Sequence, residues 1–159
     1  MDAAAVFLSV RPRSVTETRK RLHHLGYPEA LVETVVDRLI EMDYLNDAEF
    51  ARLWVESRDR ARPRGETALR RELALKGVPR EVVDEVLAER SDSAPEGDPN
   101  RSAASALLNR RRSAIERELD PMRRRQKAYA LLARNGFDPE TCREASSSFV
   151  ADMTTVTPS

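Results

Sequence analysis

The sequence is poor in the residues that build disulfide frameworks, strands and membrane spans. Among its 159 residues are one cysteine, five glycines and only 5% aromatic residues. The single Cys142 excludes an internal disulfide framework, and no segment approaches the roughly 20 apolar residues that span a bilayer. Alternating β-branched patterns are nearly absent, whereas alanine, leucine, glutamate and arginine abound. We therefore expect an all-α chain without strands.

The N-terminus lacks the pattern of a secretory signal. Asp2 precedes a short apolar stretch, and the arginines follow that stretch instead of preceding it. With a single cysteine, this pattern predicts a protein of the reducing cytoplasm that does not enter a membrane.

Recognisable catalytic constellations are also missing. The sequence has no glycine-rich phosphate loop, no serine nucleophile elbow and no P-loop. His23 and His24 are adjacent and point in different directions on a helix, with no further ligand at metal-binding spacing. Cys142 falls on the inward side of its predicted helix, as a small core residue. We expect a binding protein and not an enzyme, with no metal and no cofactor.

What the chain does contain is a repeat. Arg11-Pro12-Arg13 and Arg62-Pro63-Arg64 stand at the same distance before Gly26 and Gly77, and Gly136 marks a third, more divergent copy. A glycine that ends one helix in the left-handed conformation, followed by a proline in the first turn of the next, accounts for this pattern. Each repeat is therefore predicted to contain a helix, a tight corner and another helix.

The predicted organisation is nine helices in three groups. The boundaries are residues 1–45 for the first repeat, 46–90 for the second, 91–99 for a linker or loop, 100–150 for the third repeat and 151–159 for a disordered tail. One long arginine-rich helix is expected between Asp98-Pro99 and Asp120-Pro121, since each pair supplies a capping aspartate followed by proline.

Helical spacing also predicts which apolar side chains are buried. The helix that starts at Pro28 is expected to bury Leu31, Val32, Val35, Val36, Leu39 and Ile40. Phe50, Leu53 and Trp54 are expected to share a buried stripe and to pack between repeats, not to stack on nucleic acid bases.

The formal net charge is zero, but the charges are distributed unevenly. Residues 1–100 carry 16 Lys and Arg against 20 Asp and Glu, whereas residues 101–159 carry 11 against 7. The excess is steepest in residues 101–137, with ten basic residues against three acidic ones. This distribution indicates a basic surface for an anionic partner, the alternative being a solvated helix face.

The repeated helix, glycine corner and helix also resemble a helix-turn-helix, whose second helix enters the major groove of DNA. In the first two repeats the helix before the glycine is basic, and the helix after it is acidic. An acidic second helix is repelled by phosphate, which argues against major-groove reading by these repeats.

The pattern resembles the RecX family of regulators of the RecA recombinase. The matching residues are Arg11-Pro12-Arg13-Ser14, Leu22 to Gly26 with Tyr27, Leu45-Asn46-Asp47 with Phe50-Ala51, Arg62-Pro63-Arg64-Gly65 and Gly136-Phe137. They cover roughly residues 5–145. The third repeat departs from the pattern, with Pro121-Met122-Arg123 where the others have the Arg-Pro-Arg corner.

The resemblance implies an elongated, curved array of three tandem three-helix repeats that lies in the groove of the RecA filament on single-stranded DNA. Such a protein restrains filament growth, ATP hydrolysis and strand exchange without catalysis. We expect a monomer whose partners are the RecA filament and single- or double-stranded DNA. The candidate contact residues are Arg62, Arg64, Arg110, Arg111, Arg112, Arg123, Arg124, Arg125, Arg11 and Arg13.

Three alternatives stay open. The arginines of the Arg-Pro-Arg corners could serve only in capping and surface solvation. The basic C-terminal helices could form a direct DNA-binding module, which predicts strongly salt-dependent binding to DNA without any recombinase. The chain could also be a purely structural adaptor.

Overall fold

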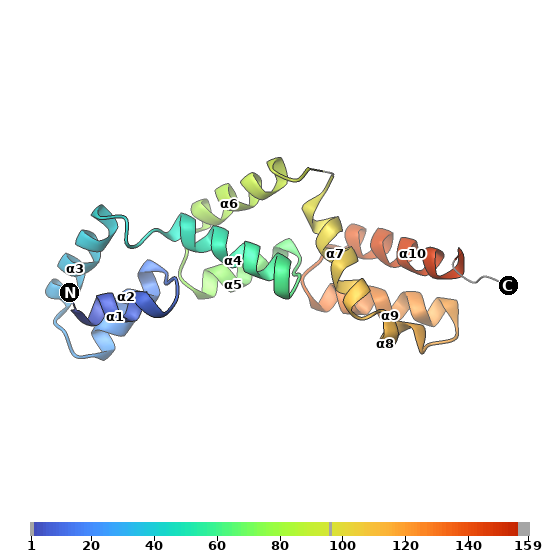
Figure 1. Cartoon of the computed structure of the whole chain (residues 1–159), viewed down its shortest axis with the longest axis horizontal. Coiled ribbons are helices and arrows are strands. Elements are labelled where there is room, and N and C mark those ends of the chain that lie inside the picture. The colour runs from blue at the N-terminus through green and yellow to red at the C-terminus, as the bar shows by residue number, and fades with distance from the viewer. Residues whose placement is uncertain (1, 96, 156–159) are drawn as a thin grey trace. The chain divides into compact units, whose positions relative to one another are not determined.

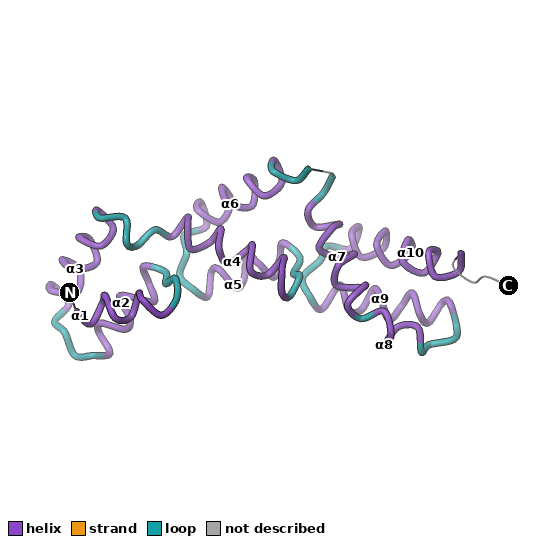
Figure 2. The backbone as a smooth tube through the Cα atoms, in the orientation of Figure 1, coloured by secondary structure: helices purple, strands orange, loops and turns teal. Residues whose placement is uncertain are grey.

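The computed structural model describes residues 2–95 and 97–155, and this part of the chain consists of helices joined by turns and loops (Figures 1 and 2). In chain order the helices are α1 (Asp2–Val10), α2 (Val15–His24), α3 (Glu29–Glu41), α4 (Asp47–Ala61), α5 (Glu66–Leu75), α6 (Arg80–Asp92), α7 (Pro99–Arg110), α8 (Arg112–Glu116), α9 (Pro121–Arg134) and α10 (Pro139–Thr155). The described residues include no strand, and the prediction of an all-α fold is confirmed.

The chain divides into two compact units. The first comprises the residues up to Val55 together with Arg71–Val86, and the second comprises Glu56–Arg70 and the described residues from Leu87 onward. The division passes through α4, α5 and α6, so it does not coincide with the repeat boundaries. Those boundaries stay a prediction from the sequence.

The helices begin where the capping signals indicate. The Ser14 hydroxyl accepts a hydrogen bond from the Glu17 amide, and the Glu17 carboxylate accepts one from the Ser14 amide, both at 3.1 Å. A serine followed three residues later by glutamate is the sequence signature of a capping box, and this reciprocal pair forms one at the start of α2. Asp98 and Asp120 cap α7 and α9, each followed by proline in the first turn.

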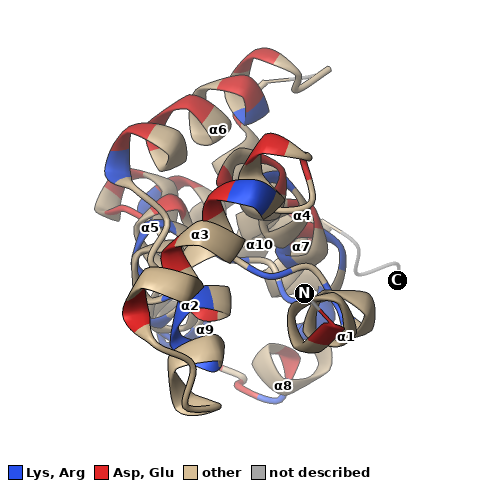
Figure 3. Ribbon diagram, turned by 90° about the vertical axis from the view of Figure 1, so that its left-hand side faces the viewer, with Lys and Arg blue, Asp and Glu red and all other residues tan. Residues whose placement is uncertain are grey.

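The corner glycines adopt the left-handed conformation expected of them. The φ angles of Gly26, Gly77 and Gly136 are 88°, 77° and 84°. Each glycine ends one helix and turns the chain into the next. The helices that follow the first two corners are acidic, as Figure 3 shows for α6.

Asp138 caps α10 and provides a test of this local structure. Its carboxylate accepts hydrogen bonds from the Thr141 amide at 2.8 Å and the Thr141 hydroxyl at 2.6 Å. These hydrogen bonds, the one from the hydroxyl foremost, lower the pKa of Asp138 below its usual value. An acid with a lowered folded-state pKa adds stability above its unfolded-state pKa, and loses it as the pH falls through the folded-state pKa.

We therefore expect Asp138→Asn to be less stable than the parent protein at about pH 7, with a smaller difference at about pH 3. Urea unfolding followed by circular dichroism at both pH values measures this difference. An equal loss of stability at both pH values would show that the ionised carboxylate is not the stabilising group.

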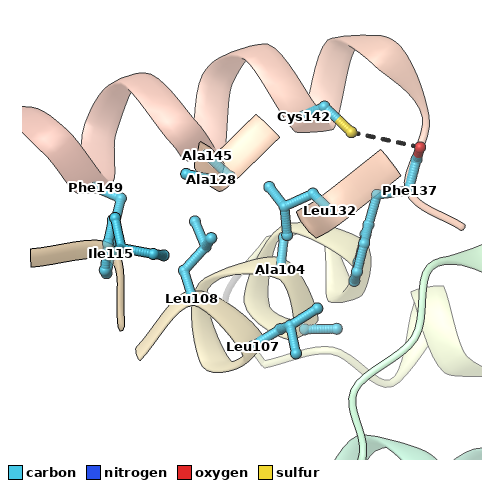
Figure 4. Close-up of a cluster of buried hydrophobic side chains, with 11 residues drawn as sticks. Ala104, Leu107, Leu108, Ile115, Ala128, Leu132, Phe137, Cys142, Ala145 and Phe149 are labelled. Atoms are coloured by element: carbon cyan, nitrogen blue, oxygen red, sulfur yellow. Dashed lines mark hydrogen bonds between the residues drawn. The ribbon is translucent and has the colours of Figure 1, made fainter. Parts of the chain in front are cut away.

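The second unit has its core between α7, α8, α9 and α10 (Figure 4). Ala104 and Leu108 of α7 and Ala128 and Leu132 of α9 are fully buried. Phe149 of α10 packs into the same cluster. One hydrophobic cluster of the first unit lies between α1, α2, α3 and the loop after α3, with the buried residues Ala4, Leu22, Val32, Val36, Leu39 and Leu45.

Cys142 is a core residue, as expected. Its side chain is 1% exposed and its thiol donates a hydrogen bond to the Phe137 carbonyl oxygen at 3.5 Å (Figure 4). Burial raises the pKa of the thiol, which keeps it protonated and unreactive at neutral pH.

Two predicted helix limits are wrong. The helix expected between Pro99 and Asp120 breaks at Arg111, and the short helix α8 begins at Arg112. The tail expected to be disordered over residues 151–159 is helical as far as Thr155, because α10 continues to that residue. Met153 packs against the core of the second unit, and this burial extends the helix beyond its periodic sequence. Residues 156–159 lie outside the described part.

Predicted burial is also wrong at three positions. Leu31, Ile40 and Leu53 are 48%, 44% and 39% exposed. Phe50 is buried as predicted, whereas the other buried residues of α4 are Ala51 and Val55. Trp54 is half-buried and does pack, with its indole N–H donating to Glu72 at 2.9 Å.

Candidate anion-binding groove

The Arg-Pro-Arg corner of the first unit packs against a glycine corner that lies far away in the sequence. The Ser14 hydroxyl donates a hydrogen bond to the Lys76 carbonyl oxygen at 2.6 Å, and Thr16 lies where a side chain at Gly77 would project. Lys76 Nζ also pairs with the Glu17 carboxylate at 3.1 Å. The corner is therefore a packing joint, which explains why it recurs together with the glycine.

The two arginines of this corner are held within the joint. Arg11 pairs with Glu17 at 3.0 Å, and the Arg13 guanidinium lies 4.0 Å from the centre of the Phe7 ring. Burial acts to raise the pKa of Glu17, but the hydrogen bonds from Arg11, the Ser14 amide and Lys76 outweigh it and lower the pKa. These contacts support the structural interpretation of Arg11 and Arg13.

The second Arg-Pro-Arg corner forms the equivalent joint inside the second unit. The Gly65 amide donates to the Asn135 carbonyl oxygen at 2.9 Å. Arg64 Nη1 donates to the Asn135 side-chain oxygen at 2.6 Å. A Cβ atom at Gly65 would collide with the backbone of Gly136 and Phe137. Only a glycine allows the two corners to approach this closely.

Arg110 joins this corner from α7. Its guanidinium donates to the carbonyl oxygens of Arg60 and Ala61 at 2.5 Å each. These carbonyls end α4, where the helix has no further amides to satisfy them and where its dipole favours a cation. Arg110 is thus bound to the corner that carries Arg62 and Arg64.

Together these contacts create a groove lined by basic side chains, which we call the arginine groove. It has a volume of about 540 Å³, and its lining includes Arg62, Pro63, Arg64, Leu107, Arg110, Arg111 and Asn135. None of the described residues that line it carries a carboxylate. Four guanidinium groups share the groove, and an anion entering it meets donors with no internal counter-charge.

The four arginines differ in their roles. Arg64 and Arg110 already donate hydrogen bonds to the protein and shape the groove. Arg62 and Arg111 are exposed, and no carboxylate among the described residues lies within 4.0 Å of either guanidinium. They are the side chains free to bind phosphate or carboxylate oxygens.

The remaining predicted arginines lie outside this groove. Arg112 pairs with Glu116 at 3.4 Å and lies over the Phe149 ring at 4.9 Å. Arg124 Nε donates to the Glu118 carbonyl oxygen at 2.9 Å, which fixes the turn before α9. Arg123 lies 3.8 Å from Asp120, and Arg125 lines a different groove. The consecutive arginines therefore do not form one surface.

Asn135 is the member of the site that the sequence did not reveal. It stands directly before Gly136, as Lys76 stands before Gly77, so aligning the repeats on their glycines would have identified this position.

The described residues contain no group of histidine, cysteine or acidic side chains suited to a metal ion. Among the same residues, no helix is long and apolar enough to span a membrane.

These features define the class of the protein as an all-helical repeat protein with a groove lined by basic side chains. Profiles of the first and second three-helix domains of RecX match residues 1–39 and 46–87. The chain therefore belongs to the RecX family, as the resemblance of its corners predicted.

Individual relatives agree with this assignment. Regulatory protein RecX of Prosthecochloris aestuarii is 33% identical over 144 residues, which cover 91% of this chain and 89% of the relative. Regulatory protein RecX of Mycobacterium avium is 35% identical over 133 residues, covering 82% of this chain and 72% of the relative. The crystal structure of RecX from Lactobacillus salivarius, 17% identical, has a TM-score of 0.77 and covers 98% of this chain and 94% of its own, showing the same fold.

Proposed function

We propose that this protein is a non-catalytic regulator, mainly an inhibitor, of the RecA recombinase. It binds in the groove of the RecA filament on single-stranded DNA and restrains filament growth, ATP hydrolysis and strand exchange. We further propose that it acts in the cytoplasm as a monomer. Membership of the RecX family supports the regulatory role, because regulation is what the names of the relatives state.

The observation that carries the proposal is the arginine groove. A nucleoprotein filament presents phosphates and acidic side chains at regular intervals, and an exposed pair of guanidinium groups is suited to bind either. Repeated helical modules add to this, because weak contacts made by successive repeats combine through effective concentration. Binding of this kind requires no catalysed reaction at the groove.

The test is the single-stranded-DNA-dependent ATPase activity of RecA, measured while this protein is added at substoichiometric ratios. We expect the steady-state rate to fall well before the two proteins are equimolar, because one bound molecule affects a filament of many protomers. An unchanged rate at every ratio would overturn the proposal.

A parallel titration of labelled DNA without RecA separates the proposal from direct DNA binding. A direct DNA-binding module would bind the naked oligonucleotide at the concentrations that inhibit RecA, with an affinity that falls steeply as salt rises. We expect inhibition to occur at protein concentrations that leave naked DNA mostly free.

A further inference from the structure

A second groove lies in the second unit, between α9 and α10. It has a volume of about 510 Å³ and is lined by Met122, Arg125, Gln126 and Tyr129 of α9 and by Arg143 of α10. The four α9 residues are spaced at i, i+3, i+4 and i+7, which places them on one stripe of the helix. The groove therefore runs along one face of α9 and is closed on its other side by α10.

The floor of this groove is apolar and unusually exposed. The Met122 side chain is 71% exposed, among the most exposed large apolar residues of the described part. Tyr129 is partly buried and packs against the core of the second unit, which fixes its position. An exposed methionine beside an anchored tyrosine offers an adaptable apolar surface that can fit several side-chain shapes.

The rim of the groove is basic. Neither Arg125 nor Arg143 has an ion-pair partner among the described residues, and no carboxylate is among the described residues that line the groove. Glu144, the neighbour of Arg143, is paired with Arg101 at 2.7 Å. The two unpaired guanidinium groups therefore give the rim a positive charge.

We propose that this groove docks an acidic amphipathic helix of a partner protein. One apolar side chain of that helix lies on Met122 and Tyr129, and carboxylates one turn away pair with Arg125 and Arg143. A groove between two helices with an apolar floor is suited to a helix that carries apolar residues on one face. The basic rim selects helices whose flanking residues are acidic.

The same features favour a peptide over nucleic acid. Base stacking requires a free aromatic face, whereas Tyr129 is packed against the core and Met122 has no ring. An extended phosphate backbone gains nothing from an apolar floor. The proposal concerns a site other than the arginine groove and does not depend on the identity of the regulated recombinase.

The test is fluorescence anisotropy with the full chain and a labelled helical peptide of about 15 residues, long enough for about four turns. The peptide carries leucine and phenylalanine on one face and glutamate beside them. We expect saturable binding that weakens about tenfold in Arg125→Gln/Arg143→Gln, as for the loss of charged contacts at an interface. Arg123→Gln is the matched control, since Arg123 is on the same helix but does not line the groove, and it should leave the affinity unchanged.

Two comparisons can overturn the proposal. A peptide of equal charge with glutamine in place of its apolar residues should bind about tenfold more weakly, because it loses the contact with the floor. Equal affinity of the two peptides, or no saturable binding to the parent protein, would refute the proposal. It would also be refuted if a single-stranded oligonucleotide bound in place of the peptide and lost its affinity in the double variant. Because RecA is absent from this assay, its outcome is independent of the ATPase test.

Discussion

Reversal of charge at both Arg62 and Arg111 should abolish most of the inhibition of RecA while leaving the fold intact. Both guanidinium groups are exposed in the arginine groove without a carboxylate partner among the described residues, so their replacement breaks no ion pair within this part of the chain. Each charge-assisted contact to a partner is worth about 1.5–3 kcal/mol. Loss of two such contacts should raise the half-inhibitory concentration of Arg62→Glu/Arg111→Glu by about 100-fold or more.

The measurement is the RecA ATPase titration, accompanied by thermal unfolding of each variant. The matched control is Arg71→Glu/Arg80→Glu, which changes the net charge equally at two exposed positions outside both grooves. It should inhibit nearly as well as the parent protein. Full inhibition by the groove variant would show that this groove is not a contact surface, and equal loss in both variants would show that only the overall charge matters.

Arg64 and Arg110 are unsuitable for this purpose. Arg64 is hydrogen-bonded to Asn135, and Arg110 satisfies the last carbonyls of α4. Substitution of either residue leaves polar groups of the joint unpaired, which destabilises the second unit. A loss of inhibition in those variants would not distinguish contact with the partner from a damaged fold.

Three glycine-to-alanine substitutions separate the two sources of strain at the corners, and Gly136→Ala has the largest expected effect on stability of the three. Gly26→Ala places an alanine in the left-handed conformation, and nothing lies within 4 Å of the added Cβ atom. The conformational strain alone should cost about 1 kcal/mol. In Gly65→Ala the added Cβ atom clashes with the backbone of Gly136, without strain from a left-handed conformation. This clash should cost about 3 kcal/mol. Gly136→Ala has both penalties, because its φ is positive and its Cβ atom would strike Ala68.

Urea unfolding of the three variants gives the order directly. We expect the free energy of unfolding to decrease least for Gly26→Ala and most for Gly136→Ala, which should lose about 4 kcal/mol, a large share of the stability of a small domain. Gly97→Ala is the control, because its φ of 87° is positive and its Cβ atom meets nothing within 4 Å. Equal losses at Gly26 and Gly136 would show that the close approach of the two corners does not stabilise the fold.

Much of the local structure was predictable because it depends on neighbours in the chain. The capping box of Ser14 and Glu17 and the Asp-Pro helix starts are local hydrogen-bond patterns, and the structure has them where the sequence indicates. The helix break at Arg111 and the extension of α10 were not predictable in this way. Both depend on what the helix packs against, as Ile115 and Met153 show in the core of the second unit.

The amino-acid sequence alone determined that the chain is helical, that it repeats, where its corners turn and that it belongs to the RecX family. Capping side chains, glycines at helix ends and helical periodicity act over a few residues, so their effects can be inferred from the sequence. Only the tertiary structure decided which arginines meet. It brought Arg62 and Arg64 beside Arg110 and Arg111, bound other arginines to internal partners and placed Arg125 in a separate groove. A charge run shows that side chains are exposed, but the surface they share depends on packing between segments far apart in the chain.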